Sequence, residues 1–214
     1  AQAYNHKLDV AARTSWVNYG FLFGGTNDNL EEIKAINPKT TPGLKLFLGS
    51  STGNMLVDDP NTLKEIFSAF RLPIAVHCED EQTIMANLAA YVKKFGDDIP
   101  IAHHPDIRSA EACYLSSSKA IALAKETGAR LHVFHLSTAR ETTLFQNDVP
   151  LAEKQITAEV CIHHLWFSDE DYAKKGTHIK WNPAVKSAAD RAGLWEALND
   201  CLLYTSPSPR DKTP

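Results

Sequence analysis

The chain has 214 residues, of which 43% are hydrophobic and 22% are charged, and its formal net charge is −4. These values are typical of a globular protein and exclude an intrinsically disordered chain. They also exclude a nucleic-acid binder that neutralises phosphates, because the chain has no basic excess and no basic run. Its apolar runs are far shorter than the roughly 20 residues that cross a bilayer, so no membrane segment is expected.

The first 13 residues mix polar and charged side chains with apolar ones and lack the apolar stretch of a signal peptide. The four cysteines are spread singly, without the Cys-x-x-Cys spacing of many metal and redox sites: Cys78, Cys113, Cys161 and Cys201. In a chain of this length the pattern favours reduced thiols in a cytoplasmic protein.

Short apolar runs alternate with amphipathic stretches along the chain. We predict strands at 16–23, 43–48, 73–78, 130–135, 156–162 and 178–181. We predict helices at 27–36, 62–70, 81–95, 109–127, 138–145 and 188–198. This alternation indicates an α/β fold built from βαβ units around a parallel sheet, either open or closed into a barrel. A closed (β/α)8 barrel usually needs roughly 250 residues, so this chain is short for one.

Polar side chains fall at the ends of three predicted strands. His77 and His135 each end an apolar run, and Glu159 is followed by His163 and His164. The carboxyl ends of parallel strands are where α/β enzymes build their sites. Converging imidazoles and carboxylates suit Zn²⁺ or a similar cation, although each histidine could instead be a hydrogen-bonded core residue.

Lys45 lies inside a strand that is otherwise wholly apolar. A buried ammonium without a partner is costly, so this side chain must lose its charge, pair with an acid such as Glu159, or be chemically converted. A neutral amine can add CO₂ and become a carbamate, an anion able to bridge two metal ions. The residues alone do not decide between the ion pair and the carbamate.

The remaining histidines carry less information. His132 and His135 are three residues apart, so on a strand they point to opposite faces, and we expect only His135 to line the site. His103 and His104 are expected to be loop residues without a catalytic role. The chain also lacks the GxSxG, P-loop and GxGxxG patterns. A thiol–imidazole pair of Cys78 with His77 is disfavoured because adjacent strand residues point apart.

Five blocks stand out around these residues: GLKLFLG, AVHCED, HVFHLST, TAEVCIHHL and KWNPAVK. In this order they resemble dihydroorotase of the amidohydrolase superfamily, especially the bacterial type related to hydantoinases and allantoinases. The resemblance runs from about residue 15 to residue 199. It implies a partial (β/α)8 barrel of about six βα units over residues 1–200. The proline-rich residues 201–214 are expected to form a disordered or artefactual tail.

The resemblance also implies a zinc site and a reaction. Lys45 would be a carboxylated lysine that bridges two Zn²⁺ ions, and His77 and His135 would ligate one of them. Glu159 would support the site by orienting a ligand. Asn182 would hydrogen-bond a pyrimidine-type substrate, and Ser51 or Thr52 would contact it from a loop at 49–55. The implied reaction is the reversible cyclisation of N-carbamoyl-L-aspartate to L-dihydroorotate. The substrate is a small molecule, and the parent enzyme is expected to be a homo-oligomer.

Two parts of the family's pattern do not occur in this sequence. The family has an early His-x-His strand followed by a carboxylate-binding arginine, and a late strand that ends in a catalytic aspartate. We therefore expect the 214-residue chain itself to be inactive. The alternatives are a dihydropyrimidinase, hydantoinase or allantoinase, a non-catalytic amidohydrolase-like subunit, or an α/β domain whose histidines only pack.

Overall fold

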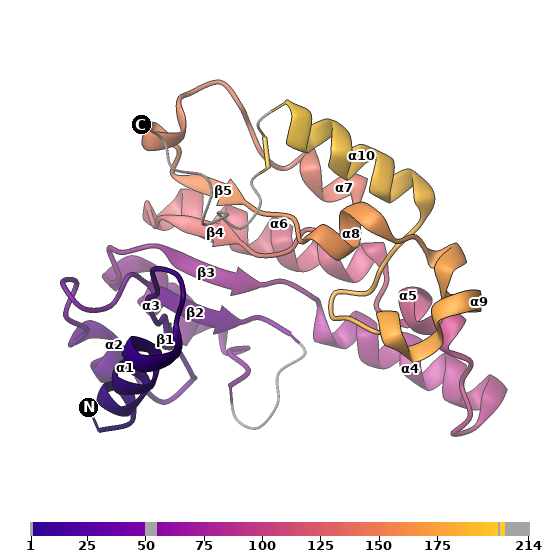
Figure 1. The fold of residues 1–214 in the computed structure, drawn as a ribbon, viewed down its shortest axis with the longest axis horizontal. Helices are drawn as coiled ribbons and strands as arrows, with labels where there is room; N and C mark the ends of the chain where they lie inside the picture. Colours follow the sequence, from indigo (N-terminus) through magenta and orange to yellow (C-terminus); the bar gives the residue numbers. More distant parts are fainter. Residues whose placement is uncertain (1, 50–54, 201, 204–214) are drawn as a thin grey trace.

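Five strands form one parallel sheet, and their order in space is their order along the chain (Figure 1). The strands are β1 (Phe23–Gly24), β2 (Leu44–Phe47), β3 (Ile74–His77), β4 (Leu131–Val133) and β5 (Ile156–Ala158). The computed structural model describes residues 2–49, 55–200 and 202–203. Helical segments join consecutive strands, which is the pattern of a (β/α) barrel.

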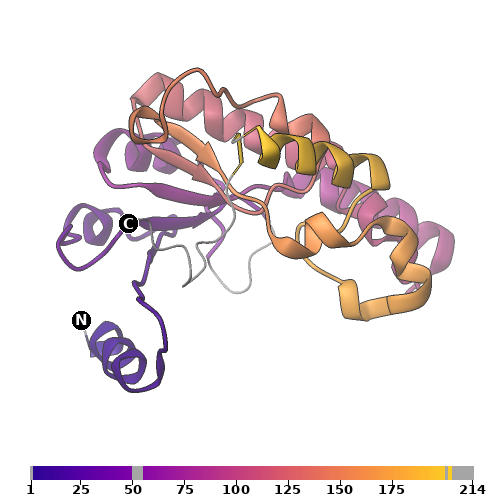
Figure 2. The same cartoon turned by 45° about the horizontal axis from the view of Figure 1, so that its top comes forward.

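Ten α-helices are described: α1 (Gln2–Thr14), α2 (Leu30–Lys34), α3 (Pro60–Ala69), α4 (Glu81–Phe95), α5 (His104–Ile107), α6 (Ala110–Thr127), α7 (Ala139–Thr142), α8 (Ile162–Trp166), α9 (Tyr172–Lys175) and α10 (Ala188–Asn199). The described residues also form four short 3₁₀ helices: η1 (Ile101–His103), η2 (Leu151–Glu153), η3 (Asp169–Asp171) and η4 (Gly176–Ile179). Neighbouring helices contact one another in the series α2, α3, α6, α7 and α10. This row of helices lies along one face of the sheet, whereas α1 is set apart and joined to it by an extended segment (Figure 2).

Capping residues set the bounds of the two long helices that were predicted most closely. Asp80 caps α4 by accepting a hydrogen bond from the backbone N–H of Thr83, and Ser109 caps α6 through the N–H of Ala112. α6 ends at Gly128, whose φ of 72° is in the left-handed region that glycine adopts freely. These local signals explain why the predictions for 81–95 and 109–127 agree with the structure.

The two faces of the sheet have different surroundings. Leu44 and Leu46 of β2 belong to the main hydrophobic core, which lies between the sheet and its helices and also contains Ile66, Phe67 and Val133. Alternation along the strand therefore directs the residues between them, Lys45 and Phe47, to the opposite face, which is the interior face of a barrel. The apolar–polar alternation of GLKLFLG thus indicates where Lys45 lies.

Two strand predictions are wrong. Of the run 16–23 only Phe23 pairs with β2, and the side chain of Trp16 is fully exposed, so the run has no strand beside it over most of its length. The run 178–181 does not form a sixth strand, because residues 176–179 form η4. α1 and α8 were not predicted, and the predicted strand at 156–162 is too long, because β5 ends at Ala158 and α8 begins at Ile162.

Cys78, Cys113 and Cys161 are free thiols in the structure. Burial raises the pKa of Cys78 to about 12, which keeps its thiol protonated and unreactive at neutral pH. Within the described residues, no helix has both the length and the apolar character needed to cross a bilayer. The predicted tail at 201–214 lies outside the described residues, apart from Leu202 and Leu203.

Candidate functional site

The inner face of the sheet is arranged in layers. Lys45 of β2 is in register with Ala75 of β3, Ala75 with His132 of β4, and His132 with Thr157 of β5. Residues in register on parallel strands point to the same face, so these side chains form one layer of the interior. Phe47 and His77 are in register two residues further along and belong to the next layer, nearer the carboxyl ends of the strands. Such layers are typical of (β/α)8 barrels.

His77 and His135 meet at the carboxyl ends of β3 and β4. Nδ1 of His77 is 3.2 Å from Nε2 of His135, and the ring centroids are 4.9 Å apart. Burial, together with His77 and Lys45 nearby, lowers the pKa of His135 to about 2. His135 is therefore a neutral imidazole, which is the form that binds metal ions. The structure thus brings together the two predicted imidazoles.

Glu79 lies against the other side of the His77 ring. Its carboxylate is fully buried, and Oε2 is 2.9 Å from Nε2 of His77 and 2.5 Å from Nη1 of Arg108. Burial alone would raise the pKa of Glu79, but the hydrogen bond from His77 and the charge of Arg108 outweigh burial and lower it. Glu79 has no role among the sequence-based predictions, although an acid two residues after a strand-end histidine points to the same side of an extended chain.

Lys45 is partly buried, but its Nζ atom is shielded from solvent and has no hydrogen-bond partner among the described residues. It lies 4.8 Å from the centre of the Phe47 ring and 4.3 Å from that of Phe134. Burial lowers the pKa of Lys45 to about 8, so a fraction of the amine is neutral near physiological pH. The predicted alternative of an ion pair between Lys45 and Glu159 is absent from the described contacts.

The backbone of His135 has a φ of 42°, in the left-handed region that non-glycine residues seldom adopt. β4 has already ended at Val133, so strand alternation no longer applies at His135. The expectation that only one of His132 and His135 could face the interior is therefore wrong. His132 is in register with Lys45 through Ala75, and the turn at His135 directs its ring towards His77.

The loop after His135 is held by a second buried acid that the sequence analysis missed. Glu141 accepts hydrogen bonds from the hydroxyls of Ser117 (2.6 Å) and Thr138 (2.9 Å) and lies 3.5 Å from the backbone N of Ser137. Its burial raises the pKa of the carboxyl group. The Thr138-x-x-Glu141 spacing is that of a helix capping box, and this pattern could have identified it.

Gly49 ends the GLKLFLG block at a point where two backbones nearly touch. A Cβ atom at this position would lie 1.8 Å from the carbonyl oxygen of Glu79. Only glycine allows the chain after β2 to pass so close to the chain after β3. Gly49 therefore allows the chain that follows Lys45 to lie in contact with the chain that carries Glu79.

Glu159 does not contact the pair of His77 and His135. Its Oε2 atom lies 3.3 Å from Nε2 of His132, whose Nδ1 is 2.7 Å from the hydroxyl of Thr157. Glu159 is predicted to orient a metal-ligating histidine. In the structure it contacts His132 instead, which is not among the predicted ligands. For His77, the partner of this kind is Glu79.

Asn182 is exposed and lines a separate hollow of about 410 Å³, together with His104, Arg108 and Lys180. No described contact joins it to His77 or His135, but Arg108 borders this hollow and also holds Glu79. Ser51 and Thr52, predicted to contact substrate, lie outside the described residues.

The other histidines have structural contacts. His104 is buried with Nε2 2.7 Å from the carbonyl oxygen of Trp181, and His103 lies 2.9 Å from the carboxylate of Asp106. Both lie in helical turns rather than in a loop. His163 stacks on Trp181, and His164 is buried with Nε2 3.1 Å from the carbonyl oxygen of Pro183.

The donor atoms fit part of a zinc site. Two neutral imidazole nitrogens converge, and the unpartnered amine of Lys45 and the unpartnered Nδ1 of His135 lie on the same side of the sheet. Among the described residues, however, no three His, Cys, Asp or Glu side chains are grouped so that they could hold a metal ion by themselves. His77 and His135 thus offer two ligands, and a carbamate on Lys45 would offer a third.

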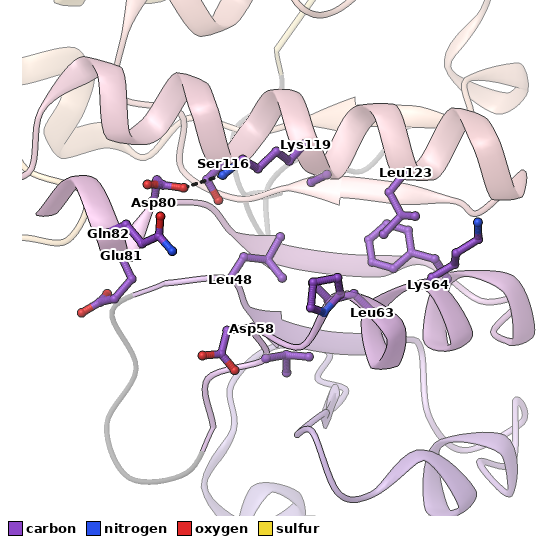
Figure 3. A pocket seen from close by; sticks show the side chains of 14 residues that line it. Leu48, Asp58, Leu63, Lys64, Asp80, Glu81, Gln82, Ser116, Lys119 and Leu123 are labelled. Atoms are coloured by element: carbon purple, nitrogen blue, oxygen red, sulfur yellow. Dashed lines mark hydrogen bonds and ion pairs between the residues drawn. The ribbon is translucent and has the colours of Figure 1, made fainter. Parts of the chain in front are cut away.

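A larger hollow of about 610 Å³ lies outside this interior, between α3, α6 and the start of α4 (Figure 3). Its floor is apolar, with Leu63 and Leu123 among its residues. Its two lysines are neutralised: Lys119 pairs with Asp80 at 2.7 Å, and Lys64 pairs with Glu126 at 2.7 Å. Unlike the inner face of the sheet, this hollow is lined by no imidazole and by no unpaired lysine amine among the described residues.

No protein-family model matches the chain. It is 28% identical to an allantoinase from Desulfitobacterium hafniense over 95% of its length, and 26% identical to a dihydroorotase from Methanosarcina mazei over 93%. Among solved structures it is similar to the L-hydantoinase (dihydropyrimidinase) from Arthrobacter aurescens, with a TM-score of 0.84 and 26% identity over 94% of the chain. These relatives support the amidohydrolase superfamily.

The structural similarity also confirms the fold prediction of an α/β, partial (β/α)8 barrel. The chain spans about half the length of these proteins: 46% of the allantoinase, 44% of the dihydroorotase and 45% of the hydantoinase. All three are cyclic amidohydrolases, which supports hydrolysis of a cyclic amide as the general kind of reaction.

Proposed function

We propose that this chain supplies part of the active site of a zinc-dependent cyclic amidohydrolase, with dihydroorotase as its reaction. The observation that carries the proposal is the approach of the two imidazoles at 3.2 Å, beside a buried lysine amine without a partner. A purely structural barrel has no need for this arrangement, because a buried amine without a partner destabilises the fold.

In this proposal each residue has a separate task. His77 and His135 present ring nitrogens to a metal ion. Glu79 contacts the His77 ring, and Glu141 holds the loop that follows His135. The neutral amine of Lys45 adds CO₂, which forms an N–C bond and releases a proton, and the resulting carbamate is a further anionic ligand. When bound, the metal lowers the pKa of a water molecule and polarises the scissile carbonyl.

Allantoinase is the second candidate, because allantoinases occur among the relatives that match more than nine-tenths of the chain. The two candidates share the inner-face residues and differ in the cyclic amide that they accept. Asn182 is the residue that we propose for the contact with substrate, and it borders the same hollow as Arg108.

The test is a substrate panel of dihydroorotate, allantoin, hydantoin and dihydrouracil, run on the 214-residue chain and, where the gene encodes a longer protein, on that protein. We expect the chain alone to be inactive and the longer protein to hydrolyse dihydroorotate fastest in a zinc-dependent manner. Preference for allantoin would favour the second candidate, and absence of bound zinc would contradict both. Turnover by the 214-residue chain would contradict its expected inactivity.

A further inference from the structure

The contacts of Glu79 determine which nitrogen of His77 carries a proton. Oε2 of Glu79 lies between Nε2 of His77 (2.9 Å) and Nη1 of Arg108 (2.5 Å). A guanidinium can only donate and an ionised carboxylate can only accept, so the ion pair leaves Glu79 as an acceptor towards His77. In the neutral imidazole, Nε2 of His77 is then the N–H donor, and Nδ1 is the atom with the free lone pair.

That lone pair faces the neighbouring histidine. Nδ1 of His77 is the atom that lies 3.2 Å from Nε2 of His135. With the opposite tautomer, Nε2 and the carboxylate would face each other as two acceptors at 2.9 Å, which is repulsive in a buried setting. The arrangement therefore tolerates one tautomer only.

We propose that Glu79, held by Arg108, is a positioning residue that fixes His77 as its Nε2–H tautomer and leaves Nδ1 as the ligand atom. The use of that atom for a metal rests on the proposed function, whereas the tautomer itself does not. Carboxylates that orient ligand imidazoles in this way are typical of metal sites.

The burial of Glu79 makes its ion pair with Arg108 necessary. The side chain of Glu79 has no exposed surface, and its other oxygen, Oε1, has no partner among the described residues. A carboxylate in such a place needs a charge partner, and the largely buried Arg108 provides it. Arg108 lies in the short connection between α5 and α6, where its backbone N–H bonds to the carbonyl of His104.

A competing explanation is that Glu79 only neutralises Arg108. In that case replacing Glu79 changes stability but leaves the His77 tautomer as it was. The two explanations are separated by long-range ¹H–¹⁵N correlation spectra of the imidazole rings in the metal-free, ¹⁵N-labelled 214-residue chain. A His77→Gln variant identifies the signals of His77.

We expect wild-type His77 to show a protonated Nε2 and an unprotonated Nδ1. Glu79→Leu should give a mixture of tautomers, whereas Glu79→Gln, whose amide oxygen can accept the same N–H, should restore the Nε2–H form. His132, which pairs with Glu159, is the internal control and should keep its signals in all variants. If Glu79→Leu fails to fold, the wild-type spectrum still tests the tautomer, because an Nδ1–H tautomer of His77 would overturn the inference.

A second measurement connects the tautomer to metal binding in the longer protein, where one is encoded. Chelator competition with Co²⁺ should show about 10- to 100-fold weaker binding in Glu79→Leu and a smaller loss in Glu79→Gln. Unchanged affinity in Glu79→Leu would overturn the positioning role. Failure of the proposed function would instead appear as an absence of amide hydrolysis while the Nε2–H tautomer persists.

Discussion

The Nδ1 atom of His77 and the Nε2 atom of His135 face each other across 3.2 Å, although the two residues are 58 positions apart in the sequence. They come from the ends of two adjacent strands, β3 and β4, so the sheet itself brings the pair together. The contact is the basis for the first prediction, because both nitrogens are needed if the pair holds a metal ion.

We expect His77→Ala and His135→Ala each to lower bound zinc at least about tenfold at equal free zinc, because each removes a ligand that binds at about 2.0–2.1 Å. Metal content measured by mass spectrometry after dialysis checks this. His132→Ala is the matched control, because His132 lies in the neighbouring layer and contacts Glu159 and Thr157. An equal loss of zinc in all three variants would contradict the assignment.

Replacing Lys45 with Met should raise the free energy of unfolding at pH 7 by about 1–2 kcal/mol, because it removes a buried ammonium that has no described hydrogen-bond partner. The thioether can pack against the rings of Phe47 and Phe134. Urea denaturation measures the change. Lys64→Met is the control, since the exposed Lys64 should change stability by no more than about 0.5 kcal/mol. A destabilised Lys45→Met variant would show that the amine stabilises the fold.

The buried carboxyl of Glu141 predicts a pH dependence of stability. Its pKa in the folded chain is raised above the ordinary value of 4.5 by burial, so the folded state binds the proton more tightly than the unfolded state. The free energy of unfolding should therefore fall as pH rises from about 4.5 through the raised pKa. Glu141→Gln lacks this titration and serves as the reference. Urea midpoints between pH 4 and 8 should show the wild type losing stability relative to Glu141→Gln, and parallel curves would contradict the prediction.

Gly49→Ala should destabilise the chain by about 1–3 kcal/mol, because the added methyl group would overlap the carbonyl of Glu79. The same substitution should disturb the His77 ring, which Glu79 contacts directly. Thermal unfolding and the imidazole spectra measure the two effects. Gly20→Ala is the control: its Cβ would meet no backbone atom, and its nearest neighbours would be two ring atoms of Pro42 at 3.3 and 3.7 Å. Equal behaviour of the two variants would argue against the close approach at Gly49.

The sequence predicted much of the sheet because β2 and β3 carry strong local signals. Leu44 and Leu46 flank Lys45 in strict alternation, which places the lysine on the face opposite the core. The run at 16–23 has similar composition, but only its last residue finds a strand to pair with. Composition indicates that a segment could be a strand, whereas pairing depends on what lies beside it in space.

The sequence could predict that His77 and His135 converge, but it could not predict the contacts that support them. Histidines at strand ends are visible in the sequence, yet the left-handed backbone of His135 is a tertiary effect that no local pattern indicates. This one backbone angle overturned the argument that His132 and His135 must point apart. The roles of Glu79 and Glu141 likewise depend on partners from distant segments, Arg108 and Ser117.

The order of the strands has a consequence for how the chain can fold. Each strand from β2 to β5 lies beside the strand that precedes it in the sequence, so each finds its partner already present when synthesis proceeds from the N-terminus. The sheet can grow one strand at a time, without waiting for a distant segment. His135, carried just beyond β4, is brought beside His77 by the pairing of β4 with β3, and the chain after β5 then holds the next residue, because the N–H of Leu136 donates to the carbonyl oxygen of Glu159.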